Sequence, residues 1–249
     1  MRLSLISLNV ERSKHLDLVI PFLKERKPDV FCVQELSERD MPQFADLFPY
    51  HSPYFPSSVY ESYQEAPNMH GLCVFSAFPL TQTDVKYYVG DASTVPPKTV
   101  LGDSSSNKKG NRAVLFASIE KEGTVFRIGT THFTWSEGGA ATDTQREHLQ
   151  KLLAVLETEN EFVLCGDFNM PRGGELFSVL AERYTDNIPA HYKTSIDVHL
   201  HREGEKDPKG LASKMVDGLF TTPGYAAHDV ELVSGVSDHM AVVASVEKS

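Results

Sequence analysis

The sequence predicts one α/β domain in which two packed β-sheets carry helices on their outer faces. Two strand–helix–strand units and several further apolar strands lead to this prediction, because helical crossovers alternate with runs of neighbouring strands. The chain has 249 residues, 41% of them hydrophobic, which is enough to bury a large core without disulfide or zinc staples. No shift in composition marks a linker, so we treat residues 1–249 as a single domain.

The first unit starts with a strand over residues 3–9. A helix follows it, and Pro28 ends that helix. An apolar strand over residues 30–33 completes the unit and runs into the polar pair Gln34-Glu35. The helix is indicated by apolar side chains at helical spacing, namely Leu16, Val19, Ile20 and Leu23.

The second unit has a strand over residues 125–131, a helix and an apolar strand over residues 162–165. Its helix is indicated by Leu149, Leu152, Leu153 and Leu156. Further strands are predicted over residues 72–76, 113–119, 215–221 and 241–246. The stretches 49–67, 90–111 and 185–214 show no clear element, and connections of this length usually border a site or are mobile.

Charge and cysteine content limit the class of protein. The chain has 24 basic and 34 acidic side chains, a net charge of −10, which disfavours coating of nucleic acid through a global field but allows a local basic groove. Three cysteines stand alone in apolar runs, so we expect buried free thiols and a reducing, cytoplasmic location. The apolar start is too short and too interrupted for a signal peptide or a membrane span.

Polar residues recur at the ends of the predicted strands, and such ends meet on one rim of a sheet-based fold. The rim would carry Asn, Glu, Asp and His side chains and no thiolate cluster. Oxygen ligands of this kind favour a hard divalent cation over zinc. The sequence therefore predicts a site for Mg²⁺, in which Mn²⁺ can substitute.

Five short motifs occur in order between residues 7 and 239: Ser7-Leu8-Asn9-Val10-Glu11, Val33-Gln34-Glu35, Thr131-His132, Gly166-Asp167-Phe168-Asn169 and Ser237-Asp238-His239. Each motif is weak alone, but the ordered set resembles the endonuclease/exonuclease/phosphatase, or deoxyribonuclease I-like, superfamily. The resemblance implies a four-layer α/β/β/α sandwich of two mixed sheets flanked by helices. It also implies metal-dependent cleavage of phosphoesters.

The resemblance implies a metal-binding role for three carboxylates. Glu35 matches the principal ligand of the family, and Glu11 and Asp238 match further acidic residues near the metal. Asn9 would hold the phosphate or the shell of ligands. In isolation, Glu11 and Asp238 fit a turn or a helix cap better than a ligand, and only the ordered set of motifs reverses this preference.

The same resemblance assigns catalytic roles. Asp167 would activate or orient the attacking water, and Asn169 would fix that water and a phosphate oxygen. His132 and His239 would donate hydrogen bonds to the non-bridging phosphate oxygens. Asp217 matches the carboxylate that pairs with the histidine of the last motif, although Gly218 stands where many relatives have Tyr or His.

Three further residues are candidates for substrate binding. Arg112 and Arg172 match arginines found near the site in some relatives, and Trp135 follows the strand that ends at His132, where it is placed to stack on a base, a sugar or an aromatic leaving group. Each also fits a structural role, as a surface charge or as cover for the core. Lys98, Lys108, Lys109 and Arg112 oppose only Asp103 and predict a local basic patch.

The predicted function is metal-dependent hydrolysis of a phosphoester by direct in-line attack of water, by a nuclease or a phosphodiesterase of the DNA-repair type. One alternative is a phosphatase or phosphodiesterase that acts on inositol, sphingolipid or nucleotide head groups. Another is a binding module that kept the fold and lost turnover. The predicted partner is a phosphoester substrate, nucleic acid in the first reading, and no membrane span is expected.

Overall fold

The fold is known from a computed structural model, which describes residues 1–62, 65–97 and 110–249. The lysine-rich loop predicted to be basic lies outside the described residues except for Arg112. The helices are α1 (Leu16–Arg26), α2 (Met41–Ala45), α3 (Asp143–Leu156), α4 (Glu175–Ala181) and α5 (Pro208–Leu211). The strands are β1 (Arg2–Asn9), β2 (Val30–Ser37), β3 (Tyr50–His51), β4 (Phe55–Ser62), β5 (Glu65–Ser76), β6 (Leu80–Val89), β7 (Arg112–Lys121), β8 (Thr124–His132), β9 (Val163–Asp167), β10 (Thr185–Asp186), β11 (Asp217–Thr221), β12 (Tyr225–Val233) and β13 (Ala241–Lys248).

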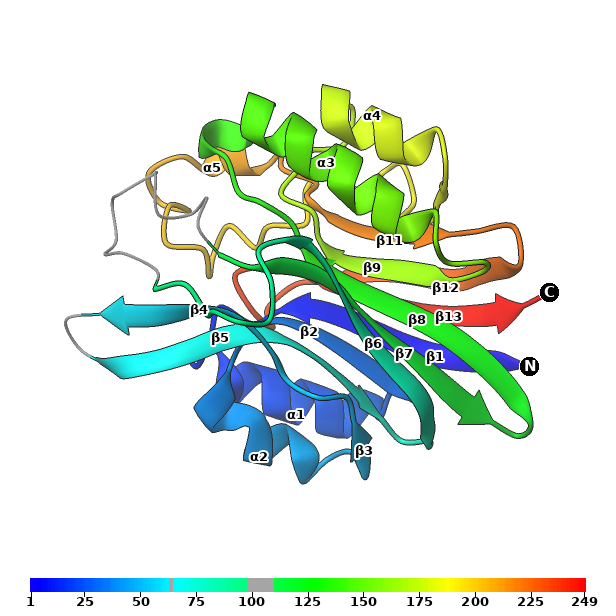
Figure 1. Cartoon of the computed structure of the whole chain (residues 1–249). Coiled ribbons are helices and arrows are strands. Elements are labelled where there is room, and N and C mark those ends of the chain that lie inside the picture. The colour runs from blue at the N-terminus through cyan, green and yellow to red at the C-terminus, as the bar shows by residue number, and fades with distance from the viewer. Residues whose placement is uncertain (63–64, 98–109) are drawn as a thin grey trace.

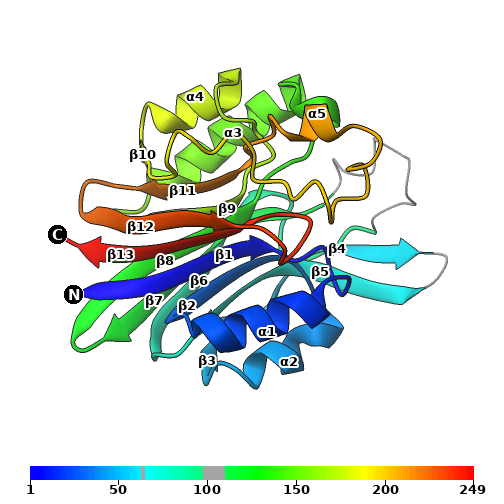
Figure 2. The same cartoon turned by 180° about the vertical axis from the view of Figure 1, so that it is seen from behind.

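These strands form two mixed sheets that pack face to face. One sheet has the order β12-β13-β1-β2-β5-β3, with β4 paired to β5, and the other has the order β10-β11-β9-β8-β7-β6. Helices α1 and α2 cover the outer face of the first sheet, and α3 and α4 cover the outer face of the second (Figure 1). The view from behind shows the same four layers (Figure 2). The predicted four-layer sandwich is confirmed.

Both strand–helix–strand units are present as parallel crossovers. β1 pairs in parallel with β2, and β8 pairs in parallel with β9, so each helix returns the chain to a neighbouring strand in the same direction. Parallel neighbours bring their carboxyl ends to the same edge. This arrangement places the polar residues at the carboxyl ends of β1, β2, β8 and β9 on one rim.

Several strands were not predicted, and most of them lie at sheet edges. β6 has only one buried residue, Tyr88, among half-exposed and exposed side chains, and β12 is similarly mixed. An edge strand with one face exposed and the other only half covered lacks the continuous apolar run that marks a central strand. The β4–β5 hairpin occupies most of the unassigned stretch 49–67, where Tyr and Pro obscured the alternation.

The core has three apolar clusters that match the layers. The cluster between the sheets includes Leu5, Val74, Leu115 and Leu219. A second cluster packs α3 and α4 on one sheet, and a third packs α1 and α2 on the other. Among the described residues, no helix is long and apolar enough to cross a membrane.

Gly166 occupies a position that only glycine tolerates, immediately before the end of β9. Its φ is +140°, and a Cβ atom there would lie 2.0 Å from the carbonyl oxygen of Thr131 in β8. Gly173 provides a contrast, since its φ is +82° but no atom lies within 4 Å of a Cβ built on it.

We therefore expect Gly166→Ala to lower the free energy of unfolding by about 2 to 5 kcal/mol, because backbone strain and a clash with a neighbouring strand add together. Gly173→Ala introduces backbone strain without a clash, so we expect it to lower the free energy of unfolding by only about 1 to 2 kcal/mol. Urea unfolding of both variants checks this difference. Equal losses in the two variants would show that the close approach of β8 does not constrain Gly166.

Candidate active site

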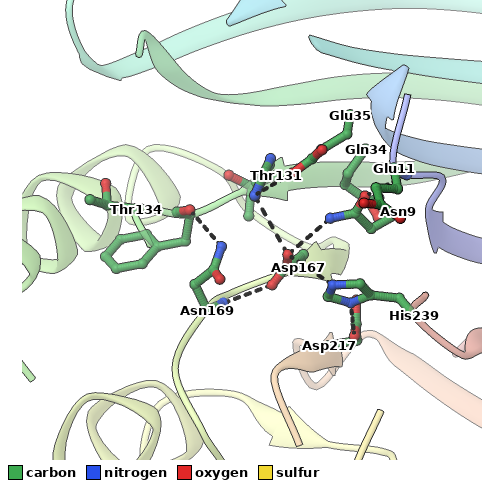
Figure 3. A network of polar contacts seen from close by, with 12 residues as sticks. Asn9, Glu11, Gln34, Glu35, Thr131, Thr134, Asp167, Asn169, Asp217 and His239 are labelled. Carbon is green, nitrogen blue, oxygen red and sulfur yellow. Dashed lines mark hydrogen bonds and ion pairs between the residues drawn. The ribbon is translucent and has the colours of Figure 1, made fainter. Parts of the chain in front are cut away.

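The predicted site residues meet at the rim where the two sheets open. Asn9 ends β1, Glu35 lies near the end of β2, and Asp167 ends β9. Asp217 begins β11, and His239 lies just before β13. The close-up shows these side chains directed toward a common centre around Asp167, from strands of both sheets (Figure 3). The convergence predicted from the strand ends is therefore present in the fold.

Asp167 lies at the centre of this group and is held from several sides. Asn9 donates a hydrogen bond from Nδ2 to its Oδ2 at 3.1 Å, and the backbone N–H of Asn169 donates to its Oδ1 at 2.9 Å. The Nε2 atoms of His132 and His239 lie 3.5 Å and 3.9 Å from Oδ2. Burial raises the pKa of Asp167, an effect that the two imidazoles oppose when they are charged.

His239 forms a buried pair with Asp217. Its Nδ1 lies 2.8 Å from the Oδ2 of Asp217, which leaves Nε2 facing Asp167. Burial alone would lower the pKa of His239, but the carboxylates of Asp217 and Asp167 raise it well above its usual value. The protonated imidazole is therefore the favoured form, and it can donate from Nε2.

Three more carboxylates, Glu11, Glu35 and Asp238, lie beside this centre. Arg12 contacts two of them, with Nη1 3.1 Å from Glu35 Oε2 and Nη2 3.8 Å from Glu11 Oε1. Burial raises the pKa of Asp238, the charge of His239 lowers it and the charges of Glu11 and Glu35 raise it, with a net pKa of about 7. Acidic groups this close favour binding of a cation because it relieves their mutual repulsion.

The backbone near the site is unusual at three of the functional residues. Glu11, Glu35 and Asn169 have φ values of +45°, +54° and +50°, a region that non-glycine residues visit rarely. Glu35 also lies where the pairing of β2 with β5 shifts register, between Val33 and Leu36. Such bulges redirect a side chain next to functional sites, and here the shift occurs where Glu35 faces the rim.

Gln34 supports the site, and our sequence analysis gave it no role. It is fully buried between the sheets and donates from Nε2 to Thr130 Oγ1 at 2.9 Å and to Ser7 Oγ at 3.2 Å. These bonds connect β2 and β1 of one sheet to β8 of the other. Its Oε1 has no hydrogen-bond partner among the described residues. The sequence signal for Gln34 was its place in the motif Val33-Gln34-Glu35.

The three predicted substrate-binding residues lie in different surroundings. Arg112 is buried, and its Nη1 donates to the backbone carbonyl of His132 at 3.1 Å, so it lies directly behind the site. Trp135 is half-buried in the segment that follows β8. The guanidinium of Arg172 lies 2.7 Å from Asp186 and donates to the carbonyls of Ile188 and Pro189, so it is partly buried and held by protein groups.

The residues present suit a divalent metal ion. Two groups place their ligand atoms within 4.8 Å of one another, and all of their members are buried. Oxygen donors dominate both groups, as a hard cation prefers. These groups are Glu11 with His15 and Asp238, and Asp167 with Asp217 and His239.

Comparison with known proteins agrees with the family resemblance of the sequence motifs. Residues 6–239 match the sequence model of the endonuclease/exonuclease/phosphatase family. No curated protein sequence matches the chain significantly. Among solved structures, the chain is similar to an endonuclease/exonuclease/phosphatase from Bacteroides vulgatus, with a TM-score of 0.70, 14% identity and coverage of 100% of both chains.

Two further similar structures belong to proteins whose names indicate a function. A mannosyl-6-phosphatase from Bacteroides thetaiotaomicron has a TM-score of 0.67 and 12% identity, and the alignment covers 98% of this chain and 99% of that one. The beta toxin of Staphylococcus aureus has a TM-score of 0.65 and 16% identity, with 97% of this chain and 99% of that one covered. At these identities the likeness concerns the fold alone.

The pairing of Asp217 with His239 predicts a measurable change in titration. Asp217 raises the pKa of His239 more than Asp167 does. Asp217→Asn removes its charge, so we expect the pKa of His239 to fall by about one unit or more. Histidine-detected NMR titration of the full chain measures this shift. Asp186→Asn is the matched control, since Asp186 pairs with Arg172 instead. An unchanged His239 titration in Asp217→Asn would contradict the pairing.

Proposed function

Because the chain belongs to the endonuclease/exonuclease/phosphatase family, whose members hydrolyse phosphoester bonds, we propose that its site cleaves a phosphodiester by direct in-line attack of water. The observation that carries the proposal is the position of Asp167, a buried carboxylate held by Asn9 and surrounded by two imidazoles. No nucleophilic side chain is needed, so the reaction proceeds without a covalent enzyme intermediate.

In this proposal Asp167 is the general base. Burial raises the pKa of Asp167, which makes it a stronger acceptor for a proton from water than an exposed carboxylate. Asn9 and the backbone of Asn169 hold its two oxygens, so the carboxylate keeps one orientation while it accepts the proton. The Asn169 side chain donates to the carbonyl of Phe133, which fixes its amide next to the attacking water.

His239 and His132 stabilise the charge that develops on the phosphate. Asp217 keeps His239 protonated, so Nε2 can donate a hydrogen bond to a non-bridging oxygen. His132 ends β8, and its Nε2 lies 3.9 Å from Glu35 Oε1 and 3.5 Å from Asp167 Oδ2. Donors placed in advance in a buried site commonly contribute a few kcal/mol each to stabilisation of the transition state.

Glu35, Glu11 and Asp238 would hold the metal ion, Mg²⁺ in the first instance with Mn²⁺ as a substitute. A bound divalent ion supplies Lewis-acid stabilisation of the phosphate oxygens. Arg12 already pairs with Glu35 and contacts Glu11, so the guanidinium holds these carboxylates in place. Glu11 and Asp238 belong to one close group of buried ligand atoms, and Arg12 connects Glu35 to Glu11, which supports this assignment.

For the substrate we propose nucleic acid, cleaved as in a nuclease or a repair phosphodiesterase. Trp135 lies just beyond β8, where an aromatic ring can stack on a base, and Arg112 contributes positive charge directly behind the site. The second candidate is a phosphorylated head group, such as a sugar, inositol or lipid phosphate. The net charge of −10 favours this candidate because a small phosphate needs fewer basic contacts than a strand of nucleic acid.

A binding module without turnover is the third reading. It requires no acid–base group, yet Asp167, Asp217 and His239 form a buried and electrostatically costly set. Such a set is expected in a working enzyme. We also propose a cytoplasmic location, which three buried free thiols among the described residues support.

We predict that the chain hydrolyses bis-p-nitrophenyl phosphate, that EDTA abolishes turnover and that Mg²⁺ or Mn²⁺ restores it. Asp167→Asn is expected to lower kcat on the order of a hundredfold or more, because the amide cannot accept the proton. Release of p-nitrophenol measures the rate. Asp186→Asn again serves as the control and should keep activity, and unchanged turnover in Asp167→Asn would refute the role of base.

The substrate class is tested by a gel-based panel of abasic duplex, single-stranded DNA, RNA and 5′-tyrosyl DNA, run beside phosphate release from inositol and sugar phosphates. The nucleic-acid proposal predicts cleavage in the first group, with Trp135→Ala raising KM because a stacking contact is lost. Turnover confined to the small phosphates would reject the nuclease reading and favour the head-group alternative.

A further inference from the structure

A histidine outside the family motifs, His15, lies beside two of the carboxylates assigned to the metal. Its Nε2 is 3.0 Å from Oε2 of Glu11, and both side chains are buried, at 6% and 8% exposed. Asp238 reaches the same place from just before β13. The ligand atoms of these three residues all lie within 4.8 Å of one another, a spacing compatible with one ion between them.

The chain between Glu11 and His15 is shaped so that the two side chains meet. Glu11 and Arg12 have φ values of +45° and +64°, two consecutive non-glycine residues in the left-handed region. This conformation is disfavoured for residues with a Cβ atom and persists only where the surroundings impose it. The backbone N–H of Glu11 donates to Asn9 Oδ1 at 3.1 Å, which connects the turn to the site.

His15 also occupies the N-cap of α1, where its side chain makes no capping hydrogen bond. Ser, Thr, Asp and Asn are strongly preferred there because their side chains accept from the first helical amides. The imidazole instead points to Glu11, while the His15 carbonyl accepts from the N–H groups of Leu18 and Val19. Departures from a local rule of this kind are expected at functional sites.

Asp238 adds a buried carboxylate to this group. Among the described residues its only side-chain hydrogen bond is the one that it accepts from Ser237 Oγ, at 3.2 Å on Oδ1. Glu11 is additionally contacted by Lys14, with Nζ 2.9 Å from Oε2. Lys14 is half-exposed at the surface and can turn toward solvent at little cost when a metal ion takes its place.

We propose that His15 is a metal ligand together with Glu11 and Asp238, so that the site binds Mn²⁺ in preference to Mg²⁺. Imidazole nitrogen suits transition metals, whereas Mg²⁺ strongly favours oxygen donors. The inference rests on the proposed function only in taking Glu11 and Asp238 as metal ligands. It extends that function by adding a nitrogen donor, which changes the identity of the preferred ion.

Pulsed electron paramagnetic resonance of Mn²⁺ bound to the full chain tests the proposal. We expect ¹⁴N modulation from a directly coordinated imidazole, replaced by the ¹⁵N pattern when the protein contains [¹⁵N]histidine. His15→Gln should remove this coupling and weaken Mn²⁺ binding about tenfold or more, with a smaller effect on Mg²⁺. His191→Gln is the matched control and should keep the nitrogen coupling, since His191 is exposed and lies outside the group.

The absence of nitrogen coupling in the labelled wild-type chain would overturn the proposal. This outcome does not depend on whether any variant folds. Coupling that persists in His15→Gln and disappears in His239→Gln would also overturn it, because the ion would then bind at Asp167 and Asp217. The proposed function fails separately. If nitrogen coupling is present but bis-p-nitrophenyl phosphate is not hydrolysed, the ligand assignment stands and the hydrolytic function does not.

Discussion

Repulsion among buried carboxylates at one rim is the constraint on which the rest of the site depends. Asp167, Asp217 and Asp238 are all buried, and Glu11 and Glu35 lie beside them. A buried charge is tolerated only when it is paired or coordinates a cation. The protein supplies part of that compensation itself. His239 compensates Asp167 and Asp217, and basic side chains of the turn after β1 compensate Glu11 and Glu35.

The two-sheet architecture delivers these groups from distant parts of the chain. Parallel crossovers bring the ends of β1 and β2 together in one sheet and those of β8 and β9 in the other. Gln34 then connects the sheets directly beneath the rim through Thr130 and Ser7. Side chains held on strands and supported by buried hydrogen bonds keep their geometry better than side chains on free loops. The precision of the site therefore follows from how the sheets are joined.

Most central elements were predictable because burial on both faces leaves a strong pattern. β9 and β11 are buried throughout, and α1 shows helical spacing, so sequence alone located them. Edge strands such as β6 lack that pattern. The start of α3 was missed although it has a capping box, with Thr142 accepting from the Gln145 N–H, a signal that the sequence does contain.

The sequence indicated many residues of the candidate site but not which of them contact one another. Ordered motifs located Asp167 and His239, whereas the contacts of Arg12 and His15 depend on a left-handed turn that no local pattern encodes. The pairing of Arg172 with Asp186 likewise could not be predicted without knowing the position of β10, which contains Asp186.

The most direct test of the account is a crystal structure of the chain grown with Mn²⁺, analysed by anomalous scattering. The account predicts one strong anomalous peak at bonding distance, about 2.2 Å, from carboxylate oxygens at this rim. A fully occupied peak elsewhere on the molecule, with these carboxylates bonded only to protein side chains, would contradict it.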